Sequence, residues 1–99
     1  MAMNDLNVVQ KEMALTRKMF FETLPHALGG DDFNVDGDEV TISNSSQSLV
    51  ILFQEKANFK LGGFSIPRAD VTLTFTGFDA EQREEVLLRF NRYFHRGGG

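Results

Sequence analysis

Oxygen-bearing side chains alternate with apolar ones in one short segment, which is how a calcium-binding loop begins. The side chains that could ligate a metal ion are Asp32, Asn34, Asp36 and Asp38. Alternate residues of such a loop direct oxygens toward the ion, and Gly37 stands where the chain must turn sharply. The match then ends, because an EF-hand needs a bidentate Glu at the position of Ser43. The same residues are typical of a tight β-hairpin with an Asp-Gly turn, and we prefer this interpretation.

The remaining polar residues do not suggest a catalytic set. His26 and His95 stand far apart, each without a neighbouring motif, and no serine lies in a nucleophile-elbow sequence. The chain has no cysteine and therefore no thiolate nucleophile or thiolate metal site. We predict no catalytic residue and no cofactor. Arg68, which follows Pro67, is the basic residue best suited to a ligand contact, and a structural role in its loop is the alternative.

Composition narrows the classes of partner. The 99 residues carry a formal net charge of −4, and such an acidic domain is repelled by nucleic-acid phosphates and by anionic membranes. No apolar run approaches the length of a membrane span. The absence of cysteine and of a signal-peptide pattern favours a cytoplasmic location. We therefore expect neither a nucleic-acid nor a membrane partner. The ten phenylalanines predict a well-filled core, an apolar partner surface, or both.

Hydropathy patterning predicts helical ends and a strand-rich middle. Residues 4–24 show a helical period, and Pro25 is expected to end or kink that helix. Alternation with period two follows, with Gly62-Gly63 as a bulge. The strands are expected at residues 33–35, 40–42, 49–53, 58–66 and 69–77. A second helix is predicted to begin with a capping box between Asp79 and Gln82 and to end at Gly97.

This order of elements predicts an α+β fold. We expect a two-layer sandwich with an N-terminal helix, an antiparallel sheet of four to five strands and a C-terminal helix. Residues 1–99 are expected to form a single domain, with residues 97–99 as a flexible glycine tail. The side chains on the inward phase of each element are expected to be buried in the core: Phe20, Leu24, Ile51, Phe53, Leu73, Phe75, Val86 and Phe90.

A second apolar line on the predicted first helix is the strongest pointer to function. Val8, Leu15 and Met19, at spacings of seven and four residues, lie nearly opposite the main apolar stripe. Such a line predicts that the helix is covered on two sides, either by the second helix or by another subunit. We therefore predict a non-catalytic protein-interaction or assembly module that is a homodimer or binds a protein partner. The alternative is a small-ligand or metal-binding protein that uses the loop at residues 32–38 or a pocket between sheet and helices.

Overall fold

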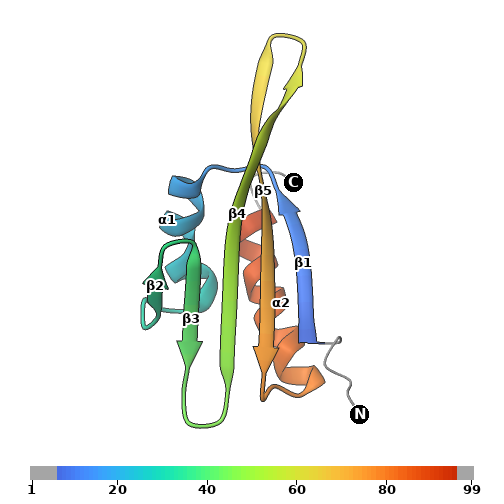
Figure 1. Cartoon of the computed structure of the whole chain (residues 1–99). Coiled ribbons are helices and arrows are strands. Elements are labelled where there is room, and N and C mark those ends of the chain that lie inside the picture. Colours follow the sequence, from blue (N-terminus) through green and yellow to red (C-terminus); the bar gives the residue numbers. More distant parts are fainter. Residues whose placement is uncertain (1–6, 96–99) are drawn as a thin grey trace.

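One antiparallel sheet and two helices make up the computed structural model, which describes residues 7–95 (Figure 1). In chain order the elements are β1 (Val8–Met13), α1 (Arg17–Leu28), β2 (Asn34–Asp36), β3 (Glu39–Ser43), β4 (Ser48–Leu61), β5 (Phe64–Thr76) and α2 (Ala80–His95). Within this range the sheet has five strands in the order β1-β5-β4-β3-β2, and each neighbouring pair is antiparallel. The predicted α+β two-layer architecture, with a helix toward each end of the chain, is confirmed.

The two faces of the sheet differ because both helices pack on the same one. Alternate side chains of the two central strands point toward the helices and are buried: Leu49, Ile51, Phe53, Val71, Leu73 and Phe75. Phe20 of α1 and Phe90 of α2 meet them from the helical layer. The ring of Phe20 stacks with its centroid 4.6 Å from that of Phe53. The predicted core is buried throughout except at Val86, which is partly buried at the edge of the core. We call the opposite face, which neither helix covers, the outer face.

The first half of the predicted N-terminal helix is a strand. Residues 8–13 form β1, which pairs with β5 at one edge of the sheet, from Val8 opposite Thr74 to Met13 opposite Ala69. Val9 and Met13 are four residues apart, and this spacing puts two side chains on one face of either a helix or a strand. Pairing with β5 decides between the two. Residues 4–6 of the predicted helix lie outside the described residues.

Helix α1 begins and ends later than the sequence pattern predicted. Thr16 is its N-cap, because its hydroxyl oxygen accepts a hydrogen bond from the backbone N–H of Met19 at 3.2 Å. Pro25 was predicted to end or kink the helix, and the structure shows that it does not end it. Proline removes one helical hydrogen bond, but the following turn still packs on the core through the buried Ala27. The helix instead ends at Gly29, whose φ of 81° is the left-handed conformation favoured by glycine.

Strands β4 and β5 form one long hairpin instead of the separate strands expected there. Gly62-Gly63 is its two-residue turn, not a bulge, and Gly62 has a φ of 59°. The irregularity lies further along, where the pairing register shifts by one residue between Lys56 and Phe59. Pro67 stands on β5 opposite this shift. A proline has no N–H to give to the ladder, so it fits where the ladder is already interrupted.

The start of α2 agrees with the sequence. The backbone N–H of Gln82 donates to the Asp79 carboxylate at 2.8 Å, and the Asp79 N–H donates to the Gln82 side-chain oxygen at 3.0 Å. This reciprocal pair is the predicted capping box. The Gln47 amide also donates to that Gln82 oxygen at 3.0 Å, which connects the β3–β4 turn to the helix. The predicted terminal residue, Gly97, lies outside the described residues.

Candidate interaction surfaces

The β4–β5 hairpin projects beyond the rest of the sheet as a two-stranded ribbon (Figure 1). Strand β1 accompanies β5 only as far as Ala69, and β3 accompanies β4 only as far as Leu52. Past these points each of the two long strands has only the other as its neighbour among residues 7–95. We call residues 57–67 the arm. A two-stranded ribbon has little surface against which to bury apolar side chains, so those that it carries face solvent.

The arm carries four apolar side chains in two cross-strand pairs. Phe59 lies opposite Ile66, and Leu61 lies opposite Phe64. The exposed fraction is 45% for Phe59, 58% for Leu61 and 74% for Phe64. Phe64 has the highest exposed fraction of the large hydrophobic side chains in the described residues. Single exposed apolar residues are ordinary on protein surfaces, but a contiguous group of this size is a mark of an interaction site.

The register shift is what gathers these side chains on one face. In β5, Phe64 and Ile66 keep the alternation that points Thr72 and Thr74 to the outer face. In β4 the extra residue reverses the alternation of side chains. Phe59 and Leu61 therefore lie on the same side of the ladder as the residues they pair with, Ile66 and Phe64. The other side of the arm is polar: the Asn58 amide donates to the Ser65 hydroxyl oxygen at 2.9 Å. The arm is therefore amphipathic, and its apolar side lies on the same side of the β4–β5 ladder as the outer face, from which the twist of the ribbon turns it (Figure 1).

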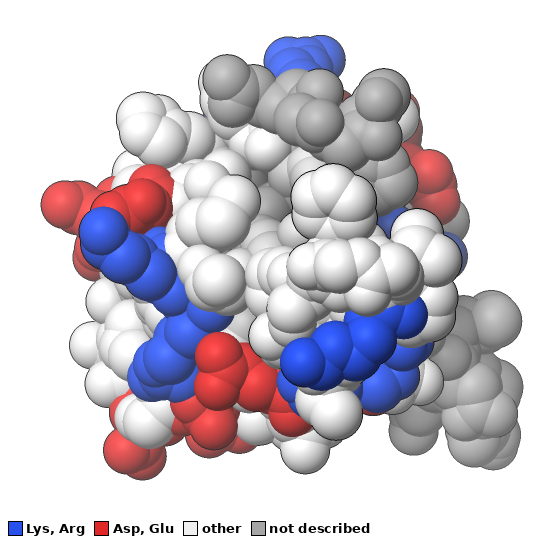
Figure 2. All heavy atoms as spheres, turned by 90° about the horizontal axis from the view of Figure 1, so that it is seen from above, with Lys and Arg blue, Asp and Glu red and all other residues white. Residues whose placement is uncertain are grey.

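A group of ion pairs lies on the outer face at the base of the arm. The Lys56 ammonium is 2.9 Å from the Glu12 carboxylate and 3.6 Å from that of Asp70, and Arg68 also pairs with Glu12. The Arg68 guanidinium carbon lies 5.9 Å from the centroid of the Phe59 ring. Two acids and two bases thus neutralise one another next to the apolar side chains. Seen from above, uncharged residues occupy the middle of the molecule, and charged ones gather toward its left and lower sides (Figure 2).

The outer face of the sheet is mixed in character. Val50 and Leu52 of β4 lie beside Thr74 and Thr72 of β5, and all four are partly buried. Threonine and valine are β-branched, and such side chains are common on sheet surfaces that are half-buried. Antiparallel sheets often leave one face in water, so an open face alone is not a site. Here the open face shares one side of the β4–β5 ladder with the apolar side chains of the arm.

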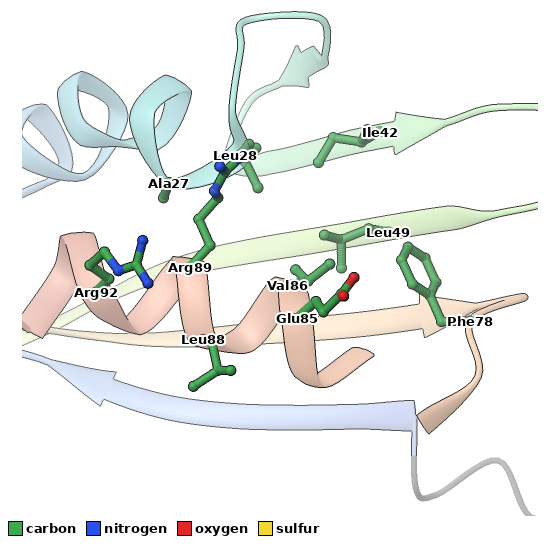
Figure 3. A pocket seen from close by; sticks show the side chains of 10 residues that line it. All are labelled: Ala27, Leu28, Ile42, Leu49, Phe78, Glu85, Val86, Leu88, Arg89 and Arg92. Carbon is green, nitrogen blue, oxygen red and sulfur yellow. The ribbon is translucent and has the colours of Figure 1, made fainter. Parts of the chain in front are cut away.

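A pocket of about 580 Å³ lies on the other side of the molecule, between α1, α2, β3 and β4 (Figure 3). Its apolar lining comes from Ala27, Leu28, Ile42, Leu49, Phe78, Val86 and Leu88. Glu85, Arg89 and Arg92 come from successive turns of α2 and form its charged wall. In Figure 3 Arg89 extends toward Leu28 at the end of α1, while Glu85 lies toward the Phe78 end. The volume is within the range of small-molecule sites, roughly 300–1,000 Å³.

The structure separates the residues of the predicted interface. Leu15 follows β1 and is 8% exposed in the chain's own core. Val8 is half-exposed at the start of β1 and points to the outer face, opposite Thr74. Met19 is half-exposed on α1. The three therefore do not form a line on one helix, because the helix that would align them does not exist over residues 8–13.

The candidate metal ligands are distributed over a hairpin and the loop before it. Asn34 and Asp36 are on β2, and Asp32 precedes that strand. Asp38 stands in the turn before β3, where its carboxylate pairs with Arg17 of α1. No group of three or more His, Cys, Asp or Glu residues that could hold a metal ion occurs within the described range. The hairpin interpretation of this segment is confirmed by the pairing of β2 with β3.

Arg68 and the histidines also have definite positions. Arg68 lies within β5 instead of a loop, and its ion pair with Glu12 gives it a structural role on the outer face. His26 is exposed on α1, with its ring centroid 6.1 Å from that of Tyr93. His95 is the last residue of α2. Among residues 7–95, no ion pair or side-chain hydrogen bond joins His26 to a serine or a carboxylate.

The arm is the feature that sequence reasoning missed, although its signal is present. Apolar residues at positions 59 and 61, two glycines, and apolar residues at 64 and 66 are the pattern of a hairpin with a Gly-Gly turn.

No helix within residues 7–95 has the length and apolar character required to cross a membrane. Comparison with known proteins finds no matching family model, no matching curated protein and no matching solved structure.

Proposed function

We propose that the protein is a non-catalytic interaction module that forms a homodimer through the apolar side of its arm and the outer face of its sheet. The observation that carries this proposal is the group of exposed side chains Phe59, Leu61 and Phe64, together with the partly buried Ile66, on a projecting ribbon. A free monomer that leaves these side chains in water forgoes hydrophobic stabilisation of about 25 cal/mol per Å². A partner that covers these side chains recovers that stabilisation.

The area of this surface matches what a stable dimer needs. Phe59, Leu61 and Phe64 leave about 300 Å² exposed, if a fully exposed side chain offers on the order of 150–200 Å². Four strands spaced about 4.8 Å apart, paired over the length of β1, add roughly 400 Å² of outer face. The total of about 700 Å² per copy is close to the 800 Å² per partner of a standard interface. The arm alone would be too small, so the proposed contact includes the sheet.

A second copy of the chain is the partner that this surface fits. In a two-fold dimer the same patch lies on both sides of the contact. The apolar side of the arm and the outer face lie on the same side of the β4–β5 ladder, although the two strands cross between the sheet and the arm, so the arm is twisted relative to the sheet (Figure 1). In the proposed dimer, each arm lies on the outer face of the other copy. The ion-paired group around Lys56 and Glu12 carries no net charge, so two copies of it do not repel each other when they meet.

Sedimentation equilibrium tests the proposal. The wild-type chain should show about twice its 11.1 kDa mass at micromolar concentration. Phe64→Ser removes the most exposed apolar side chain of the arm and should give monomers with an unchanged melting temperature at high dilution. Met19→Ser is the control, because it removes a half-exposed apolar side chain from α1, away from the proposed contact, and should stay dimeric. A wild-type mass near 11.1 kDa at all concentrations would refute the dimer.

The cytoplasmic location belongs to the same proposal. It is supported by the absence of cysteine, since proteins of a reducing compartment are rarely stabilised by disulfide bonds. The ligand-binding alternative has one supporting observation, which is the pocket between the helices and the sheet.

A further inference from the structure

We infer that the pocket between α1, α2, β3 and β4 binds a small amphipathic carboxylate, with its acid group on Arg89 and Arg92 and its apolar tail on the pocket floor. The pocket lies on the helical side of the sheet, away from the outer face, so this site is separate from the proposed dimer contact. Two features of the lining carry the inference: its apolar floor and two guanidinium groups that have no ion-pair partner in the part of the chain that the structure describes.

The floor is suited to an apolar tail. Leu49 is buried, and Ile42, Phe78 and Val86 are partly buried around it. The Phe78 ring packs edge-on against that of Phe75, with the centroids 5.2 Å apart, so its position is fixed by the core. Side chains fixed in this way form a pocket that does not have to be rearranged before a ligand enters, which lowers the cost of binding.

The arginines provide the polar end. Among residues 7–95 neither Arg89 nor Arg92 has an ion-pair or side-chain hydrogen-bond partner. A guanidinium group presents donors in a planar fork that matches both oxygens of a carboxylate. The chain is acidic as a whole, but charges further than about 8–10 Å away are largely screened at physiological salt, so these two groups dominate locally.

The position of Glu85 determines which way round the ligand lies in the pocket. It lies one turn of α2 before Arg89, toward Phe78, and it is exposed (Figure 3). A carboxylate ligand would be repelled at that end and attracted at the Arg92 end. From Glu85 to Arg92 the helix rises about 10 Å at 1.5 Å per residue, so the pocket fits a medium acyl chain or a ring, not a long-chain lipid.

Titration with decanoate below its micelle concentration tests the inference on the full chain. Backbone amide NMR signals of residues 27–28, 42, 49 and 85–92 should shift and saturate. Decyltrimethylammonium, which has the same tail and the opposite charge, should bind at least tenfold more weakly, because it cannot accept charge-assisted hydrogen bonds from the two guanidinium groups. Equal affinity for the two head groups, no saturable shift, or shifts confined to the arm would overturn the inference.

Two variants separate recognition from general charge. Arg89→Gln with Arg92→Gln should lower the decanoate affinity at least tenfold and abolish the preference for the anionic head group. Lys18→Gln removes one positive charge from an exposed site on α1 outside the pocket and should leave the affinity within about twofold of wild type. Both replaced arginines are exposed, so the fold should survive, and this is checked by thermal melting. A double variant that binds decanoate as wild type does would refute the role of the arginines.

Discussion

Replacing Phe20 by alanine should remove a large part of the stability of the domain. Phe20 is fully buried, and its ring lies 4.6 Å from that of Phe53 on the sheet and 5.3 Å from that of Phe94 on α2. It is thus the side chain at which both helices and the sheet meet. Truncation of a core Phe to Ala costs about 3–5 kcal/mol, and each aromatic pair adds about 0.5–1.5 kcal/mol beyond area burial. We therefore expect a loss of about 4–5 kcal/mol, against a total of roughly 5–15 kcal/mol for a small domain.

Urea unfolding measures this loss. With an m-value of about 1.5 kcal/mol/M, the midpoint should fall by about 3 M. Met19→Ala is the matched control, because its side chain is the neighbour of Phe20 on α1 but half-exposed, and the midpoint should change by less than about 0.3 M. All chains are compared at one concentration, since dimer formation adds to the apparent stability. A fall of less than about 0.5 M for Phe20→Ala would refute the arrangement in which α1 is held on the sheet by this ring.

Other perturbations test local features of the fold. Gly77→Ala should lower the free energy of unfolding by more than about 1 kcal/mol, because φ is 82° and a Cβ would overlap the Ser46 carbonyl oxygen, whereas Gly30→Ala, with open space around it, should be nearly neutral. Asp79→Ala should cost about 1 kcal/mol in the same urea assay, through loss of the helix cap. Calcium titrated below millimolar concentration should cause no saturable amide shift in the β2–β3 hairpin, and a micromolar affinity lost on Asp36→Ala would contradict this expectation.

The local signals of the sequence predicted the elements that depend on few residues. The capping box of Asp79 and Gln82 and the tight hairpin at Gly37 are formed as expected, since each is set by contacts within a few positions. Strand β1 could not be predicted in the same way. Val9 and Met13 share a face in a helix and in a strand alike, and only pairing with β5, some sixty residues away, selects the strand.

In the arm, too, the sequence predicts the local feature but not the one that depends on strand pairing. The Gly-Gly turn of the arm could be found from the sequence, but the shared orientation of Phe59 and Phe64 could not. It depends on one extra residue in β4 between Lys56 and Phe59. Pro67 on the opposite strand is compatible with an interrupted ladder, but it does not indicate which strand carries the extra residue. The predicted helical line of Val8, Leu15 and Met19 is wrong for a different reason. Val8 and Leu15 were placed on a common face by a helical period that the chain does not follow at that point.

The most direct test of the proposed dimer is an isotope-filtered NOE spectrum of a mixture of labelled and unlabelled chains. The arrangement proposed here predicts intermolecular NOEs from the ring protons of Phe59 and Phe64 to methyl groups of Val50 and Leu52 on the outer face of the other copy. Intermolecular NOEs to the methyl group of Met19, or none at a concentration at which sedimentation shows dimers, would contradict it.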